Sequence, residues 1–276
     1  MLQPITLNVG HPGSLTRIDC LQEAHQKVAE ERDLLRTEAN AFSDFCARLD
    51  EIDCETTPGE AVTSTSATHD TIAFHGDPAP HQGDTPIRDA YLETVMDTPH
   101  YEREYADSYW ESITAEFGNE FAMMLEQAAV ITPALKDHVL TAAQQSKAQR
   151  KQLISTLNRE ASTLEAANAE LYTIAEEANA IRSRPYHDCT TAELQHLRAD
   201  IEDLSAQVED LATRRQSGDL ELHAVGAGLK NTLRRTKYFY ESLETTHPIL
   251  DPVATISDQL TTTNQRITDI LATRTA

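Results

Sequence analysis

The residues best suited to binding a ligand lie in two basic stretches in the second half of the chain. Residues 136–159 hold five basic side chains against one acidic one, and residues 214–240 hold six against two. Basic side chains beside aromatic rings can clamp phosphates and stack on bases, which makes nucleic acid one candidate ligand. The candidate partner-binding patch comprises Lys147, Arg150, Lys151, Arg214, Arg215, Lys230, Arg234, Arg235, Lys237, Tyr238 and Tyr240.

A second interpretation pairs the same cations with carboxylates of this chain or of a protein partner. Residues 1–131 contain 7 basic and 25 acidic residues, so this half would repel nucleic acid. The helix predicted there carries acidic side chains at suitable spacing, namely Glu23, Glu30, Glu31, Asp33 and Glu38. Exposed ion pairs are common in proteins. We therefore favour intramolecular or protein-partner pairing over nucleic-acid binding.

No motif of a common catalytic or nucleotide-binding site occurs in the sequence. The patterns G-x-x-x-x-G-K-[ST], G-x-G-x-x-G, H-E-x-x-H, C-x-x-C and G-x-S-x-G are all absent. The four cysteines are widely spaced, and we expect free thiols in a reducing cytoplasm. A bundle can bring separated groups together. The sequence nevertheless predicts no catalytic residue, no cofactor-binding residue and no cofactor.

Histidines and aspartates recur within residues 55–84 and could in principle bind a metal. His69, His75 and His81 follow one another at six-residue spacing, each near an aspartate. The surrounding Thr, Ser, Pro, Gly and acidic residues are too polar to bury a face, which is typical of a disordered linker. Metal ligands need a rigid support. We therefore expect a solvated acidic linker and no metal site.

Long helices must position these groups. Apolar residues repeat at alternating three- and four-residue spacing, which predicts an all-α fold: an elongated antiparallel helical bundle or coiled-coil hairpin with a small aromatic-rich helical module. The predicted divisions are an N-terminal tail (1–13), a first long heptad helix (14–54), a disordered acidic linker (55–84), a short-helix aromatic and Met-rich module (85–131), a long helix (132–184), a returning helix with a break near 216–228 (185–246) and a C-terminal heptad helix (247–276).

Proline and threonine mark the boundaries of the central helices. Thr132 and Pro133 begin a helix of about 50 residues, which must end near Pro185 because proline cannot continue it. Thr190 and Glu193 form a predicted capping box that begins the next helix. The short turn between them predicts an antiparallel hairpin. The helical seams can close within one chain or leave a surface for a second copy.

The module at residues 85–131 concentrates the large apolar side chains. It holds seven of the aromatic residues and three of the four methionines. We predict short helices near 86–96, 99–117 and 119–130. Such a composition favours a compact local core, because aromatic and thioether groups bury the most surface per residue. A docking groove for a partner is the alternative, because methionine surfaces adapt to varied ligands.

The composition indicates a salt-rich cytoplasm. The chain has 45 acidic and 23 basic residues and a formal net charge of -22. Concentrated salt screens the repulsion among surface carboxylates, so we expect the fold to weaken in dilute buffer. The start of the chain has no basic segment followed by an apolar one, and no run of about 18 apolar residues occurs. We infer a cytoplasmic chain without a signal peptide or membrane span.

Four segments of the sequence resemble an uncharacterised protein family of haloarchaea. They are YLETVMDTPHYEREY at 91–105, ESITAEFGNEFA at 111–122, ITPALKDHVL at 131–140 and HPILDPV at 247–253. The resemblance extends over roughly residues 15–270 and agrees with the acidic composition. It implies no activity, cofactor or catalytic residue.

Abundant helical seams and absent site motifs lead to one functional hypothesis. We expect a non-enzymatic coiled-coil scaffold or regulatory protein of a halophilic archaeon, which binds another protein or a second copy of itself. The alternative is a nucleic-acid-binding regulator that uses the local basic and aromatic patch.

Overall fold

The computed structural model describes residues 2–3, 5–8, 15–54, 85–222 and 239–275. It confirms the predicted all-α class, because long helices pack together and a buried aromatic cluster fills a core. The chain divides into two compact units. The large unit consists of Met1–Asp33 and Leu153–Ala276, and the small unit of Leu34–Gln152.

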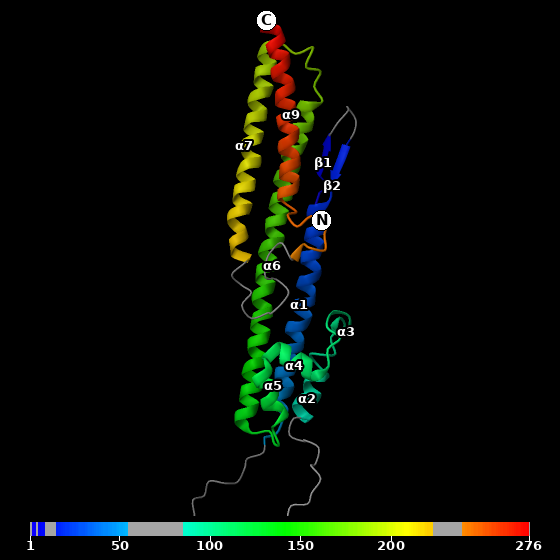
Figure 1. Cartoon of the computed structure of the whole chain (residues 1–276), viewed down its shortest axis with the longest axis vertical. Coiled ribbons are helices and arrows are strands. Elements are labelled where there is room, and N and C mark those ends of the chain that lie inside the picture. Colours follow the sequence, from blue (N-terminus) through cyan, green and yellow to red (C-terminus); the bar gives the residue numbers. More distant parts are fainter. Residues whose placement is uncertain (1, 4, 9–14, 55–84, 223–238, 276) are drawn as a thin grey trace, which may run out of the picture. The chain divides into compact units, whose positions relative to one another are not determined.

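Figure 1 labels the elements. They are β1 (Ile5–Asn8), β2 (Leu15–Ile18), α1 (Cys20–Glu51), α2 (Thr85–Leu92), α3 (Tyr101–Glu104), α4 (Tyr109–Phe117), α5 (Asn119–Glu126), α6 (Pro133–Arg182), α7 (Thr191–Leu222) and α9 (Leu250–Thr275). The two long helices α1 and α6 contribute residues to both units. Within the described ranges, no helix combines the length and apolar composition needed to cross a membrane.

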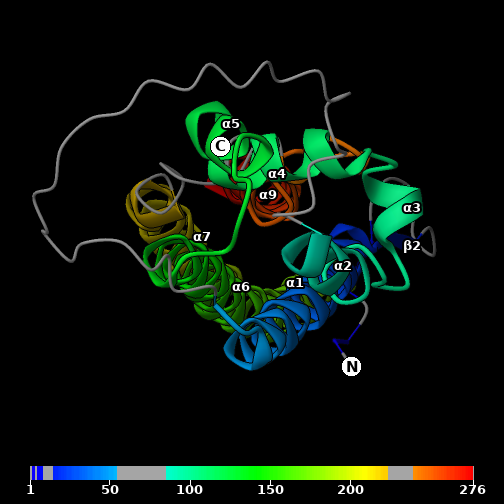
Figure 2. The ribbon, with the colours of Figure 1, turned by 90° about the horizontal axis from the view of Figure 1, so that it is seen from below.

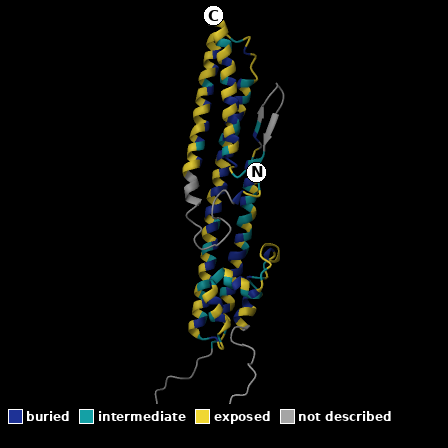
Figure 3. Ribbon diagram, viewed as in Figure 1, coloured by how far each residue is buried: buried dark blue, intermediate teal, exposed yellow. Residues whose placement is uncertain are grey.

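In the large unit, α6 and α7 form the predicted antiparallel hairpin, and α9 packs along α7. The two helices of the hairpin lie side by side in both views (Figures 1 and 2). Leu157, Leu164 and Leu171, which the heptad spacing of α6 assigns to its seam, are fully buried. Figure 3 shows buried residues running in stripes along the long helices, with exposed residues on their outer faces.

The turn of this hairpin is closed by local caps and by the end of α9. The backbone N–H of Glu193 donates to Thr190 Oγ1 at 3.2 Å, and Thr190 N–H donates to Glu193 Oε2 at 2.6 Å, so the predicted capping box is confirmed. The guanidinium of Arg274 donates to backbone carbonyls of the turn, including those of Tyr186 and His187. The side-chain cation of Arg274 in α9 thus satisfies backbone carbonyls of the turn between α6 and α7.

The N-terminal residues differ from the predicted tail and helix start. β1 and β2 form an antiparallel pair in which Ile5 lies opposite Ile18, and α1 begins at Cys20. The Asp19 carbonyl accepts the first helical hydrogen bonds, from the N–H groups of Gln22 and Glu23. Ile18 belongs to β2 but lies three residues before Leu21 of α1. Because this spacing is also helical, the sequence pattern assigned Ile18 to the helix.

In the small unit, α1 and α6 run antiparallel. Lys147 Nζ donates to Ser43 Oγ at 2.8 Å, and Lys136 Nζ donates to the backbone carbonyls of Asp50 and Ile52 at 2.9 and 2.8 Å. The last carbonyls of a helix lack partners within it, so Lys136 caps the C-terminus of α1.

The short helices of the small unit enclose the buried aromatic cluster that the sequence predicts. The ring of Tyr91 lies at its centre and meets Phe42, Phe45, Tyr109 and Phe117 edge-on, at 5.2–6.5 Å between ring centroids. Edge-to-face contacts of this kind stabilise aromatic pairs beyond the area they bury. Residues from α1, α2 and α4 thereby form one core.

The helix predicted over residues 99–117 is divided into α3 and α4. Ala106 takes a φ of 50°, which interrupts the helical path. Ser108 then begins α4, and both its N–H and its hydroxyl donate to Glu111 Oε2, at 2.9 and 2.7 Å. These two bonds lower the pKa of the Glu111 carboxyl. The cap at Ser108 therefore begins a separate helix, although the spacing of apolar residues predicts one continuous helix.

The returning helix α7 continues through Gly218 to Leu222, so it contains no break up to that residue. The rest of the range 216–228, where the sequence predicts a break, lies outside the described residues. A glycine costs a helix only about 1 kcal/mol, which favourable neighbours can offset. Residues 223–238 lie outside the described part of the chain.

Replacing the N-cap of α7 tests the contribution of the capping box. Thr190→Ala should lower the free energy of unfolding by about 1 kcal/mol, because the first N–H groups of α7 lose their acceptor. Thr190→Ser keeps the hydroxyl and is the matched control. Chemical denaturation in concentrated salt measures both. Equal stability of the two variants would show that the cap contributes nothing.

Candidate functional site

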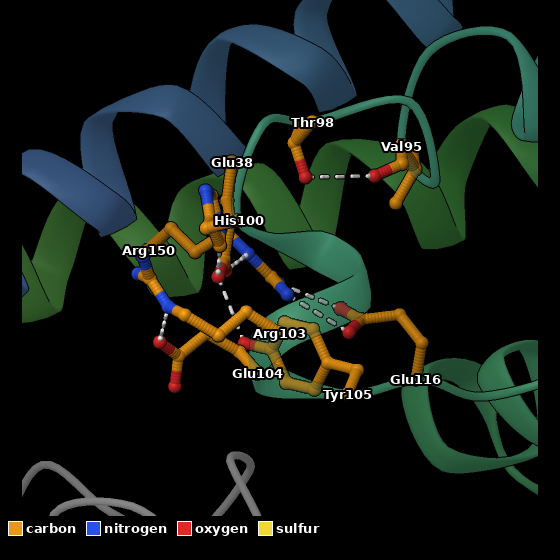
Figure 4. Close-up of polar contacts among 9 residues, drawn as sticks. All are labelled: Glu38, Val95, Thr98, His100, Arg103, Glu104, Tyr105, Glu116 and Arg150. Carbon is orange, nitrogen blue, oxygen red and sulfur yellow. Dashed lines mark hydrogen bonds and ion pairs between the residues drawn. The ribbon is translucent and has the colours of Figure 1, made fainter.

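The most concentrated group of charges in the small unit surrounds Arg150, a residue of α6 that is only 5% exposed. Its Nε donates to Glu38 Oε2 at 2.7 Å. Its two terminal nitrogens donate to the two oxygens of Glu116, at 2.7 and 2.9 Å. One guanidinium therefore joins a carboxylate of α1 to a carboxylate of α4, and both geometries are short and charge-assisted (Figure 4).

Glu38 is the second centre of this network. Its Oε1 accepts a hydrogen bond from the Tyr105 hydroxyl at 2.8 Å and lies 3.2 Å from His100 Nε2. An ionised carboxylate has only acceptors, so His100 Nε2 must carry the proton of this bond. His100 and Tyr105 flank α3. Glu38 thus holds the α3 segment against α1 and α6. We call Glu38, His100, Tyr105, Glu116 and Arg150 the Arg150 network.

The electrostatics keep Arg150 charged and the Tyr105 hydroxyl protonated, so both remain donors. Burial alone would lower the pKa of Arg150, but the hydrogen bonds and charges of Glu116 and Glu38 outweigh it and raise that pKa. Burial and the Glu38 carboxylate raise the pKa of the Tyr105 hydroxyl, which therefore remains a donor. The guanidinium also lies 4.4 Å from the Phe42 ring centroid. The ring supplies cation–π attraction without competing for hydrogen bonds.

A small cavity of about 70 Å³ adjoins the network. Its walls include Glu38, Glu116 and Arg150, together with the buried pair Tyr91 and Ser112, whose oxygens lie 2.9 Å apart. At ~30 Å³ per water molecule, this space suits about two waters. All four carboxylate oxygens of the network already accept hydrogen bonds. The arrangement is therefore built to hold helices together.

The large unit contains a second buried ion pair of the same chemical type. Arg215 of α7 donates through both terminal nitrogens to the two oxygens of Glu160 in α6, each at 2.8 Å. The Tyr240 hydroxyl donates to Glu160 Oε1 at 2.7 Å. Glu160 is only 2% exposed. Again an arginine, a glutamate and a tyrosine hydroxyl join separate segments. We call these three residues the Arg215 network.

An open groove of about 690 Å³ lies beside the Arg215 network. Small and hydroxyl side chains of α6 line it from Ser155 to Ala167, together with Asn158 and Arg159. Leu211 and Ile249 are apolar residues of the lining, which also includes Arg214. The hydroxyl residue Thr156 is buried in this lining.

The members of the predicted basic patch are divided between the two units and the residues that the structure does not describe. Lys147, Arg150 and Lys151 belong to the small unit, and Arg214, Arg215 and Tyr240 to the large unit. Lys230, Arg234, Arg235, Lys237 and Tyr238 lie outside the described residues. Of the described members, Arg215 and Tyr240 meet directly, at Glu160.

The described arginines of the patch pair with carboxylates of the same chain. Arg150 and Arg215 form the buried networks described above. Arg214 is exposed and contacts Glu170 at 2.7 Å and Asp210 at 2.8 Å. Internal pairing, the interpretation we favoured, thus occurs at all three arginines. Their partners come mainly from α4, α6 and α7, and from the acidic first helix only at Glu38.

Thiol and metal chemistry are not concentrated in the described part of the chain. Burial, reinforced by the nearby Asp251 carboxylate, raises the pKa of Cys20 to about 11, and burial raises the pKa of Cys46 as well. Both thiols are therefore protonated at neutral pH. Nowhere in the described ranges do three or more His, Cys, Asp or Glu side chains gather to hold a metal ion. The histidine-rich residues 69–84 lie outside those ranges.

The sequence carries a partial signal for these networks. Arg150 and Glu160 occupy positions on the heptad seam of α6, which places a charge where an apolar side chain is expected. Such a position indicates a buried pair. The partners His100, Tyr105 and Glu116 carry no comparable signal, because each lies in the short-helix module without a regular period.

Long packed helices, buried Arg–Glu–Tyr networks and an aromatic core define the chain as an all-α protein of helical-bundle type. The chain belongs to the family described as a domain of unknown function (DUF7260), which matches residues 19–264. This match confirms the resemblance to a family without an assigned activity. Neither a curated protein nor a solved structure matches the chain.

Neutralising Arg150 tests whether the Arg150 network stabilises the small unit. Arg150→Met should lower the free energy of unfolding by about 3–5 kcal/mol, because two carboxylates lose their buried partner. Lys151→Met, at the exposed neighbouring position, should change it by less than about 1 kcal/mol. Denaturation in concentrated salt compares the two. A similar small effect for both variants would contradict a stabilising role for the network.

Proposed function

We propose that this chain is a non-enzymatic helical scaffold or regulatory protein that acts in the cytoplasm of a halophilic archaeon by binding other proteins. The observation that carries the proposal is where the charged and apolar side chains of the described residues lie. The buried arginines and glutamates pair with one another in the Arg150 and Arg215 networks, whereas the apolar side chain of Met123 on α5 is exposed.

The buried networks support a scaffold because of what they leave available. A catalytic acid or base needs a lone pair or proton that faces a substrate. In the Arg150 network, both oxygens of Glu38 and both oxygens of Glu116 already accept hydrogen bonds from this chain. The same is true of Glu160 in the Arg215 network. These groups position helices, and the outer surface remains for partners.

The acidic composition supports a halophilic source. A formal net charge of -22 on 276 residues weakens a fold in dilute solution through self-repulsion, whereas concentrated salt screens that repulsion. The many carboxylates keep the chain soluble under those conditions.

A nucleic-acid-binding regulator stays a prediction. The described arginines of the basic patch, Arg150, Arg214 and Arg215, already pair with glutamates, which supports internal pairing in preference to phosphate binding. Phosphate binding would also have to overcome the acidic charge of the chain.

Isolation of the chain with its partner tests the proposed function. The tagged full chain is purified in concentrated salt from cells that naturally make it, and each copurifying protein is then produced separately. We expect one of them to re-form a complex of fixed stoichiometry with the purified chain, as measured by size-exclusion chromatography with light scattering. Self-association of the chain alone would also support a protein-binding role. A strictly monomeric chain that re-forms no complex contradicts the proposal.

A further inference from the structure

Exposed large hydrophobic side chains are few among the described residues and cluster in the short-helix module. They are Tyr105, Met123 and Val130. Tyr105 is 47% exposed, but its hydroxyl is committed to Glu38. Met123 is 48% exposed and lies on α5, and Val130 follows shortly after that helix. The apolar surface with a free outer face is therefore that of α5.

Helix α5 packs one apolar face into the module and leaves one large apolar side chain, Met123, exposed. Phe121, Ala122 and Leu125 face inward and belong to the aromatic core. Beside that face, Met123 is exposed and lines an open groove of about 410 Å³ together with Glu120, Met124, Gln127 and Ala128. Met124 and Ala128 are partly buried and also pack against the core. The groove therefore has an apolar floor that the core holds in place, and Met123 extends that floor toward solvent.

Methionine suits such a surface because its unbranched thioether side chain adapts to different apolar shapes. Met123 is about half exposed, and its sulfur accepts one weak, local hydrogen bond, from Asn119 Nδ2 at 3.6 Å. Covering this side chain would remove apolar area from water at little cost in broken contacts. The groove can therefore bind apolar side chains of a partner protein.

The charges around the groove specify the partner. Residues 85–131 contain ten acidic and two basic residues. Both basic side chains are engaged elsewhere: Arg88 lies 5.3 Å from the Tyr109 ring centroid, and Arg103 pairs with Glu104 at 2.9 Å. Glu120 lines the groove, and Glu126 ends the same helix. Within the described residues, neither carboxylate has a basic partner. The groove therefore has an apolar floor with Glu120 at its side, in an acidic part of the chain.

We propose that this α5 groove binds a basic amphipathic helix of a partner protein. The apolar face of that helix would cover Met123 and Met124, and its lysines or arginines would lie against Glu120 and Glu126. Helices in grooves are a common mode of peptide recognition, and charge complementarity selects among apolar ligands of similar shape. The inference rests on the proposed protein-binding function and assigns it a surface and a partner class.

A peptide panel tests the groove on the full chain. The probe is a fluorescent amphipathic peptide of about 18 residues, roughly five helical turns, with one leucine face and lysines on its flanks. One control peptide replaces lysine with glutamate, and another scrambles the order. Fluorescence anisotropy across a series of KCl concentrations measures binding. We expect saturable one-to-one binding of the lysine peptide only, with an affinity that decreases as salt increases.

Variants of α5 locate the binding. Met123→Ser should weaken binding about tenfold, which corresponds to ~1.4 kcal/mol, and Met123→Leu should preserve it. Glu120→Lys should weaken it about fivefold at low salt, with a smaller effect as salt increases. Glu202→Lys, an exposed position on α7, is the matched charge control and should have no effect. Circular dichroism checks that each variant remains folded.

Four outcomes would overturn the proposal. One is equal binding of the glutamate peptide, and another is unchanged binding by Met123→Ser and Glu120→Lys. The third is self-association of the chain that Met123→Ser abolishes, which would assign the groove to a second copy. A purified protein partner that binds the Met123→Ser variant normally would overturn this surface and leave the proposed function intact.

Discussion

Arg150 carries its positive charge into a site where water reaches very little of it, and the arrangement of the small unit depends on how that charge is satisfied. Removing a guanidinium from water costs several kcal/mol unless its donors meet acceptors of opposite charge. Glu38 and Glu116 provide those acceptors from α1 and α4. Any packing of these helices that separates the three side chains would leave a buried charge without a partner.

This constraint answers a problem that heptad helices create. An apolar seam repeats every seven residues, so two such helices could slide by about 10 Å and still bury leucines against leucines. A buried charged pair at one seam position penalises the shifted arrangement. Arg150 performs this function between α6 and α1 in the small unit. In the large unit, Glu160 and Arg215 do so between α6 and α7. In each network, a tyrosine hydroxyl also joins a further segment of the chain, through Tyr105 at Glu38 and through Tyr240 at Glu160.

Residues with regular spacing or strong local caps could be predicted from the sequence, and long-range partners could not. Pro133, Pro185 and the Thr190 cap mark the helices of the hairpin because proline and N-cap chemistry are local. Ala106 takes the positive φ that divides α3 from α4. Because alanine normally favours a helix, its residue type gives no sign of this break. Glu38 lies 112 residues before Arg150, and no periodicity connects them. Arg150 occupies a seam position, which is typical of a buried residue. It also lies in a stretch rich in basic residues, which instead favours an exposed patch.

The networks also provide the rigid support that the proposed α5 surface requires. The Arg150 network and the Tyr91 core hold α1, α4 and α6 together, so α5 can present Met123 from a fixed base. Glu38 holds the α3 segment through His100 and Tyr105, while its other carboxylate oxygen accepts from Arg150. Amide hydrogen exchange of the Glu38→Gln variant tests this claim most directly, because glutamine has the same shape but only one acceptor oxygen. The account predicts exchange at least about tenfold faster in residues 97–108, with unchanged exchange in α7. Unaltered protection of residues 97–108 would contradict it.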